Sequence, residues 1–212
     1  MKHTLAAFAL MLGTASFAQA ATIQNGSFEE GSPAGVFSTL GAGSTAITGW
    51  TVGSGNIDYI GTYWQASAGS RSLDLTGNTR GSIFTTITDL IIGTAYKLSF
   101  DLSGNPAGQP AIKQLDVTLS NPLTTENYLY NVKTAKNTLS DMKWVTYVLG
   151  FVATSTESVI TFATGNGTGG AACCYGPALD NVQISAVPVP AGGLLLLTGL
   201  AGFAAMRRRK KA

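Results

Sequence analysis

Residues Tyr96–Ser103, which read YKLSFDLS, alternate strictly between apolar and polar side chains. Successive side chains of a β-strand point to opposite faces, so this alternation places one face on a core and the other in water. The same period of two recurs in Leu115–Leu119, at the apolar positions of Val145–Phe151, and in Val182–Ala186. These segments are therefore expected to be β-strands.

Shorter strand candidates fill most of the remaining chain, separated by glycine, asparagine and proline. They are Ile47–Val52, Asn56–Gly61, Ser70–Leu75, Ser82–Thr88, Asn127–Val132 and Ser158–Ala163. No stretch between residues 21 and 186 has a convincing helical period. Some ten short strands in one domain predict an all-β fold, a β-sandwich with jelly-roll topology.

The first twenty residues have the pattern of a secretory signal peptide. A weakly basic start precedes the apolar run Thr4–Phe17, and Ala18-Gln19-Ala20 is a small-x-small cleavage site. We expect cleavage after Ala20 and export of the remaining chain.

The C-terminus combines an apolar run, Ala191–Met206, with five consecutive basic residues, Arg207–Lys211. A helix over the run would be roughly 24 Å long at ~1.5 Å per residue, against a bilayer core of ~30 Å. The pattern predicts one C-terminal transmembrane helix that anchors the protein in the membrane with its basic end in the cytoplasm. A buried core helix is the alternative. The expected organisation is a signal peptide at 1–20, a β-sandwich at 21–186, and a sorting motif, transmembrane helix and basic tail at 187–212.

The tail also resembles a family of sorting signals. Val187, Pro188, Val189 and Pro190, followed by the apolar run and the arginine cluster, resemble the PEP-CTERM sorting domain of Gram-negative bacteria in a Val-Pro-x-Pro-Ala variant. The resemblance implies processing by an exosortase and transfer to the cell surface or extracellular matrix. The sequence leaves open whether the anchor is retained or cleaved.

The charge and histidine content of residues 21–186 exclude several function classes. This segment has seven basic and eleven acidic residues, a net charge of −4, and no basic patch of the kind that nucleic-acid binders need. The one histidine of the chain, His3, lies in the signal peptide. The exported segment therefore lacks Ser-His-Asp and Cys-His catalysis and histidine-ligated metals, and we expect no enzyme.

Motifs at the two ends of this segment carry a second resemblance. An opening Asn25–Glu29 (NGSFE) and a closing Leu179–Val182 (LDNV) resemble galactose-binding-like jelly rolls, which include many carbohydrate-binding modules. With the sorting tail and three intervening motifs, the chain resembles the bacterial choice-of-anchor C surface proteins; these motifs are Gly49–Val52, Asn56–Ile60 and Ser72–Asn78.

The resemblance to these jelly rolls implies that the first and last strands lie together and hold a structural Ca²⁺. The carboxylates of Glu29 and Asp180 would be its ligands, with backbone carbonyls completing a shell of about 6–8 oxygens. The alternative is that Asn25 and Asp180 cap turns and that Phe28 fills the core.

Aromatic and charged residues gather between positions 58 and 74. A sugar site commonly combines an aromatic platform with a few polar groups that fix the hydroxyls, and such sites usually lie on loops. The candidate binding residues are Asp58, Tyr59, Tyr63, Trp64, Arg71 and Asp74. The alternative for Tyr59 and Trp64 is a place in the core, where Trp50 and Trp144 are also expected from their alternating surroundings.

Cys173 and Cys174 are adjacent in the sequence. Export favours their oxidation, yet neighbouring Cα atoms lie only ~3.8 Å apart, below the usual disulfide range of about 4.4–6.8 Å. A vicinal disulfide, two free thiols and an intermolecular bridge all stay open.

Three function classes remain. The first is a non-catalytic surface or matrix protein that binds extracellular polysaccharide. The second is a structural matrix or biofilm component that binds no sugar. The third is a glycoside hydrolase with a carboxylate pair such as Asp58 and Asp74, although no motif fixes that pair.

Overall fold

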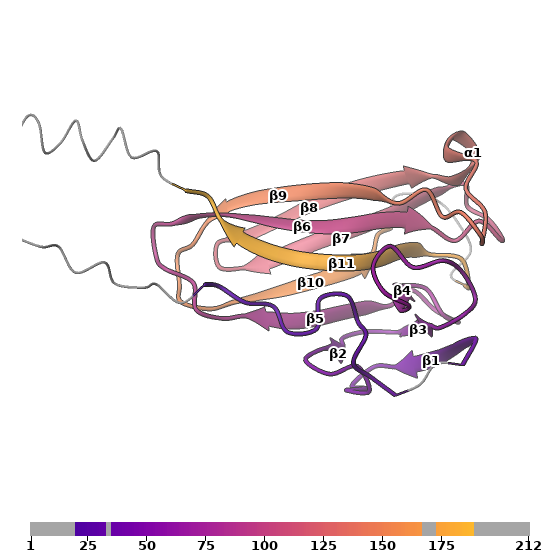
Figure 1. Ribbon diagram of the computed structural model, residues 1–212, viewed down its shortest axis with the longest axis horizontal. Helices are drawn as coiled ribbons and strands as arrows, with labels where there is room; N and C mark the ends of the chain where they lie inside the picture. Colours follow the sequence, from indigo (N-terminus) through magenta and orange to yellow (C-terminus); the bar gives the residue numbers. More distant parts are fainter. Residues whose placement is uncertain (1–19, 33–34, 167–172, 189–212) are drawn as a thin grey trace, which may run out of the picture.

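The computed structural model describes residues 20–32, 35–166 and 173–188, which form two antiparallel β-sheets packed face to face (Figure 1). The apolar side chains of the alternating segments form the hydrophobic layer between the two sheets. The prediction of an all-β sandwich is confirmed.

The first sheet has six strands, and every neighbouring pair in it is antiparallel. In spatial order they are β1 (Phe37–Gly41), β3 (Asn56–Ile60), β4 (Ser72–Asp74), β11 (Pro177–Ala186), β6 (Ala95–Gly104) and β9 (Val145–Val152).

The second sheet has five strands, again antiparallel throughout. In spatial order they are β2 (Thr51–Val52), β5 (Ser82–Ile87), β10 (Ser158–Thr164), β7 (Ile112–Ser120) and β8 (Leu123–Asn131). The single-turn helix α1 (Val132–Ala135) follows β8, and the Asn131 side chain caps it by accepting the N–H groups of Lys133 and Thr134.

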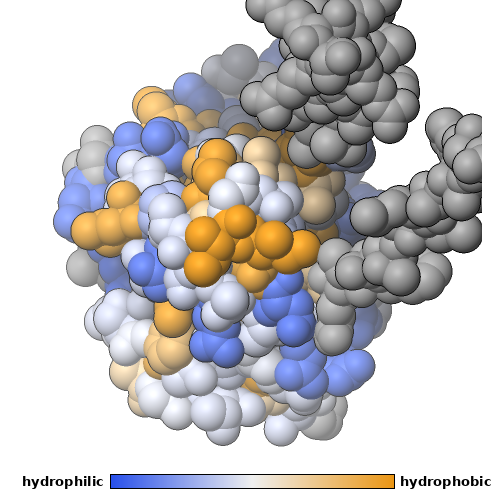
Figure 2. All heavy atoms as spheres, turned by 90° about the vertical axis from the view of Figure 1, so that its left-hand side faces the viewer, coloured by the Kyte–Doolittle hydropathy of each residue, from blue (hydrophilic) through white to orange (hydrophobic). Residues whose placement is uncertain are grey.

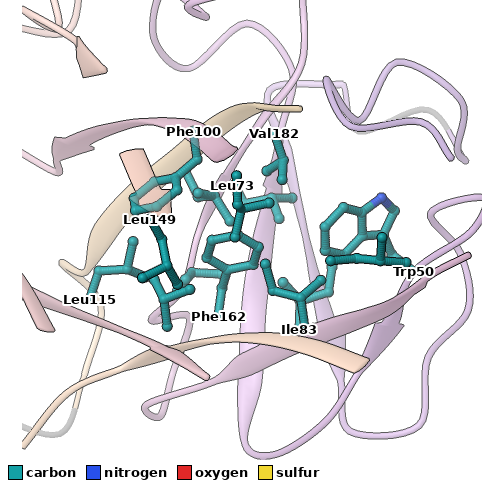
Figure 3. Packing of buried hydrophobic residues seen from close by; sticks show 14 of the residues in the cluster. Trp50, Leu73, Ile83, Phe100, Leu115, Leu149, Phe162 and Val182 are labelled. Atoms are coloured by element: carbon teal, nitrogen blue, oxygen red, sulfur yellow. The ribbon is translucent and has the colours of Figure 1, made fainter. Parts of the chain in front are cut away.

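The main core lies between the sheets and follows the period of two. Leu98, Phe100 and Leu102 on β6 are completely buried, as are Leu115, Val117 and Leu119 on β7. Figure 3 shows Phe100 and Leu149 meeting Phe162 and Leu115 from the facing sheet. Trp50 is also buried in this core, as expected.

A second, smaller apolar cluster contains Ile60, Trp64, Met142 and Ala178. Ile60 and Ala178 alternate along their strands with Tyr59 and Leu179, which belong to the main core, so the small cluster lies on the outward face of the six-stranded sheet. Trp144 packs against this cluster half-buried, and its indole N–H donates to the Gln65 carbonyl at 3.0 Å.

Several strand predictions needed correction; the predicted strand Asn127–Val132, for example, is β8, which runs from Leu123 to Asn131, and Val132 begins α1. Strand β1 was not predicted because this edge strand, FSTLG, lacks apolar alternation. The predicted strand Ile47–Val52 shortens to Thr51–Val52, because Gly49 has a left-handed φ of +81° and a turn joins the Trp50 N–H to the Ile47 carbonyl.

Both described ends of the chain leave from the same end of the sandwich (Figure 1). The Thr22–Thr88 bridge holds the first, and the hydrogen bond from the Val187 N–H to the Ala95 carbonyl, 2.8 Å, holds the second. Figure 2 shows apolar side chains gathered on this end. In the turn between β5 and β6, Ile91 and Ile92 are 46% and 63% exposed.

The predicted localisation, membrane anchoring through a C-terminal helix, is corrected. Across residues 20–32, 35–166 and 173–188, no helix has the length and apolar character to cross a membrane. A span needs about 20 apolar residues, and the run Ala191–Met206 is shorter than that. This run, like the predicted signal peptide up to residue 19, lies outside the described residues.

Candidate functional site

The opening and closing motifs of the domain lie against each other. The Val182 N–H donates to the Gly26 carbonyl at 2.8 Å, and a Cβ on Gly26 would overlap the Val182 carbonyl oxygen. Asn25 adopts a left-handed φ of 51°, and its side-chain amide donates to the carbonyls of Glu30 and Thr48. The motif residue Gly26 is therefore required by close backbone contact.

The Glu29 carboxylate fastens the loop that precedes β4. Its Oε1 accepts the N–H groups of Ser70 and Arg71, both at 2.8 Å, and its Oε2 accepts the Ser70 hydroxyl at 2.8 Å. Both oxygens are thus occupied by hydrogen-bond donors.

Asp180 fastens the same loop from β11. Its Oδ2 accepts the N–H groups of Ser67 at 2.7 Å and Ala68 at 2.9 Å, and its Oδ1 accepts the Asn181 N–H at 2.6 Å. The neighbouring Asp101 accepts the Ser67 hydroxyl. Burial raises the pKa of Asp180 to about 7, more than the three N–H groups lower it.

These contacts do not fit a Ca²⁺ ion held by Glu29 and Asp180. Amide hydrogens point at the carboxylate oxygens that a cation would need. The alternative from the sequence accounts for what is seen: Asn25 and Asp180 secure turns, and Phe28 is fully buried in the core.

A cavity of about 230 Å³ lies on the outward face of the six-stranded sheet and is called the Asp58 pocket below. Asp58 on β3 is directly opposite Asp74 on β4, because the two strands pair in that register. The pocket is lined by Phe37, Thr39, Asp58, Ile60, Tyr63, Asp74, Gly77, Asn78, Asn105, Cys174 and Tyr175.

Asp74 is buried at the base of this pocket. Its Oδ1 accepts the N–H groups of Thr76 and Gly176, both at 2.9 Å, and its Oδ2 accepts the Asn105 side-chain amide at 2.8 Å. Burial dominates over these hydrogen bonds and raises the pKa of Asp74 to about 7; the nearby Asp58 raises it further.

Asp58 is only half-buried and retains hydrogen-bonding capacity. Its Oδ1 accepts the Thr39 hydroxyl at 2.6 Å, and burial raises its pKa despite this bond. A Cβ on Gly77 would lie 3.0 Å from Asp58 Oδ1 and 2.7 Å from Asn56 Oδ1. Glycine at position 77 thus leaves room around the carboxylate.

Aromatic rings from three parts of the chain line the same pocket. Tyr63 meets Phe37 edge-on with ring centroids 5.6 Å apart, and burial raises the pKa of Tyr63. Tyr175 is 37% exposed. The Tyr175 backbone is held by the Lys113 ammonium group, which donates to its carbonyl at 2.7 Å and to the Gly108 carbonyl at 2.9 Å. Burial lowers the pKa of Lys113 to about 8.

Cys173 and Cys174 are joined by a disulfide. Cys174 adopts a left-handed φ of 82°, and its N–H donates to the Gly77 carbonyl at 2.7 Å. The disulfide thus lies at the wall of the Asp58 pocket, next to Tyr175.

Residues 21–185 match the family described as Protein of unknown function (DUF642). The chain belongs to the DUF642 family. A curated relative, halomucin of Haloquadratum walsbyi (strain DSM 16790 / HBSQ001), is 35% identical over 204 residues, which cover 88% of this chain. The chain spans about 2% of halomucin's length.

Solved structures of carbohydrate-binding modules are similar to this DUF642 domain. The CBM22-1-CBM22-2 tandem domain of Paenibacillus barcinonensis Xyn10C matches with a TM-score of 0.50 and 19% identity, covering 81% of this chain and 46% of that one. The CBM22-1 xylan-binding domain of the same protein has a TM-score of 0.48 and 18% identity, covering 75% and 99%. The likeness to the tandem domain indicates a jelly-roll sandwich of the kind found in carbohydrate-binding modules.

The six binding residues predicted from the sequence do not form one site in this DUF642 domain but lie in three different places. Asp58, Tyr63 and Asp74 line the Asp58 pocket. Tyr59 and Trp64 are buried: the Tyr59 hydroxyl donates to the Phe28 carbonyl, and the Trp64 indole N–H donates to the Ser72 hydroxyl. Buried rings offer no platform to a sugar, so their assignment is corrected to the core alternative.

Arg71 lies in a different depression. Its guanidinium is 5.7 Å from the centre of the Tyr59 ring, and the side chain lines a shallow surface hollow with Trp64 and Gln65. The sequence missed Phe37, Asn105 and Tyr175, which reach the pocket from distant segments. No spacing pattern points to them, although the adjacent cysteines mark the neighbourhood of Tyr175.

The buried carboxyl groups predict a pH dependence of stability for this DUF642 domain. The folded pKa of Asp74 and of Asp180 is about 7, against about 3.9 in an unfolded chain. Between about pH 4 and pH 7 the folded state holds protons that the unfolded state has released. The stability that these two protonated carboxyl groups contribute to the folded state is fully present below about pH 4. It is lost as pH rises through 7. We expect the melting temperature to fall from about pH 5 to about pH 8.

Calorimetry of the protein and of Asp74→Asn checks this expectation. The variant lacks one of the two titrating groups, so its melting temperature should fall less over the same range. Glu126→Gln, at an exposed carboxylate on β8, should leave the change of melting temperature with pH the same as in the unmodified protein. A melting temperature that rises toward pH 8, or an equal slope in Asp74→Asn, contradicts the prediction.

Proposed function

We propose that this DUF642 protein is exported and binds an extracellular polysaccharide without catalysing a reaction on it. The supporting observation is the Asp58 pocket, where the accessible Asp58 carboxylate and the side chains of Tyr63, Tyr175 and Phe37 line one cavity. Aromatic rings provide apolar contact area for the faces of a sugar ring, and the polar groups fix its hydroxyls.

The size of the pocket favours one sugar residue within it. At about 230 Å³ it is smaller than the roughly 300–1,000 Å³ typical of sites for drug-sized ligands. A polysaccharide would therefore place one unit, at a chain end or on a branch, between Tyr63 and Tyr175. The adjoining units would lie outside the cavity.

The hydrogen bonds of Asp74 argue against a glycoside hydrolase. Such an enzyme needs two carboxyl groups that reach the substrate. Both Asp74 oxygens already accept hydrogen bonds from Thr76, Gly176 and Asn105, and the residue is 1% exposed. Asp58 is thus left without an accessible partner, and a binding role fits better.

Export and processing form part of the proposal. The β-sandwich of residues 21–186 would be the functional unit after removal of the signal peptide. The motif Val187–Pro190 would be the recognition element for an exosortase, as its resemblance to sorting signals implies.

Binding to a glycan array tests the function, followed by affinity measurements on the best ligand. We expect Asp58→Ala and Tyr175→Ala each to weaken binding about tenfold or more, equivalent to about 1.4 kcal/mol. Asp58→Ala removes a polar contact, and Tyr175→Ala removes an exposed ring while its backbone contact to Lys113 remains.

Glu126→Ala is the matched control, because it removes an exposed carboxylate on the far edge strand β8. Its affinity should equal that of the unmodified protein. Pocket variants that bind normally would exclude this site. An array without any bound glycan would reject sugar binding and favour a structural matrix component.

A further inference from the structure

The charged side chains that line the Asp58 pocket all carry the same sign. Its ionisable residues are Asp58, Tyr63, Asp74 and Tyr175, and no lysine or arginine is among the described residues that line it. Within the part of the chain that the structure describes, the pocket therefore has acidic groups on two adjacent strands and no cation on its wall.

The basic residues nearest to the pocket have other partners. The Lys113 ammonium group lies 6.0 Å from the centre of the Tyr175 ring and donates to the carbonyls of Tyr175 and Gly108. Arg71 lies over the Tyr59 ring in the neighbouring hollow. Arg80 donates to the Asn166 side chain at 2.8 Å. None of these three groups lines the Asp58 pocket.

Among the described residues that line the pocket, the one group that accepts hydrogen bonds as a carboxylate with room for more donors is Asp58, whereas Asn78 and the two tyrosine hydroxyls can donate as well as accept. An ionised carboxylate offers about four lone-pair sites, and within the described residues Asp58 receives one donor, the Thr39 hydroxyl. The side-chain amide of Asn105, by contrast, has partners for all its groups: it donates to Asp74 and to the Cys174 carbonyl, and its oxygen accepts the Ala107 N–H. A ligand that supplies donors would complete this arrangement.

We infer that the Asp58 pocket selects an amino sugar, whose ammonium group donates to the Asp58 carboxylate while its ring lies against the pocket's aromatic side chains. Sugars that carry a carboxylate or a sulfate are disfavoured, because they would bring an anion into a cavity with acidic walls. Neutral sugars are intermediate, since their hydroxyls can donate to Asp58 without adding charge. The inference rests on the proposed function and names its ligand class.

Matched oligosaccharides test the inference by isothermal titration at about 150 mM salt, where charges beyond about 8 Å are largely screened. The probes are β-1,4-linked hexamers of glucosamine, glucose and glucuronate, with galactosamine, galactose and galacturonate as a second series. We expect the amino sugar of at least one series to bind about tenfold or more tighter than its uronate. Asp58→Asn should reduce this ratio about tenfold.

Glu126→Gln distinguishes recognition in the pocket from attraction by the overall negative charge. It removes the same charge as Asp58→Asn but lies on the distant strand β8, so the ratio should stay unchanged. An equal loss in both variants would overturn the inference, as would a uronate that binds as tightly as the amino sugar, or no amino-sugar binding in either series. Retention of other glycans on the array would then leave the proposed function standing.

Discussion

Asp180→Ala is expected to lower the free energy of unfolding by about 2–4 kcal/mol. Asp180 is fully buried and accepts three backbone N–H groups, from Ser67, Ala68 and Asn181. Each buried donor left without an acceptor costs about 1–3 kcal/mol, and water that enters the loop offsets part of this. At ~2–4 °C per kcal/mol for a domain of this size, thermal unfolding at about pH 8 should reveal a clear loss.

The same experiment separates the amide contacts from a calcium site. If the N–H groups of the loop are the partners of Asp180, the loss is the same in excess EDTA and in excess calcium. Glu126→Ala, an exposed carboxylate, should change little in either solution. A calcium-dependent rise in melting temperature that disappears in Asp180→Ala would contradict this account and restore the metal site.

Gly26→Ala should destabilise the fold by about 2–4 kcal/mol. Its new Cβ would overlap the Val182 carbonyl oxygen, which is backbone and cannot rotate away. To relieve this overlap, the opening motif has to move away from β11. That movement breaks the hydrogen bond from the Val182 N–H to the Gly26 carbonyl. Overpacking of this kind typically costs 1–3 kcal/mol, roughly, before such a bond is lost.

Gly41→Ala is the matched control for this substitution. Gly41 ends the edge strand β1, and a Cβ there would meet no atom within 4 Å. Chemical denaturation of both variants should show a large shift for Gly26→Ala and almost none for Gly41→Ala. Equal shifts would mean that the loss of glycine flexibility, rather than the contact with Val182, determines the cost.

Strand periodicity predicted the sandwich because apolar alternation is a direct consequence of one buried face. It worked for β6 and β7, whose alternate residues fill the main core. It failed for β1, an edge strand whose side chains are partly exposed along its whole length. Such a strand is held by pairing with β3, and pairing leaves no apolar signature in the sequence.

The candidate site was predicted only where its residues lie close together in the sequence. Asp58, Tyr63 and Asp74 were found, whereas Phe37 and Tyr175 join them through sheet order and loop closure. The misplacement of Tyr59 has a simple physical reason. On a strand, neighbours face opposite sides, so Asp58 in the outward pocket puts Tyr59 into the main core.

Both described chain ends leave the sandwich on the same side (Figure 1). This position determines how the domain can be attached to a support. Strand β11 runs from Pro177, beside the Asp58 pocket, to Ala186, a distance of roughly 30 Å for ten residues at about 3.3 Å each. A tether, a neighbouring module or a reporter fused at either end would therefore attach at the opposite pole. Many copies fixed to one support would all turn the same face outward, which suits avid capture of a long, repetitive ligand.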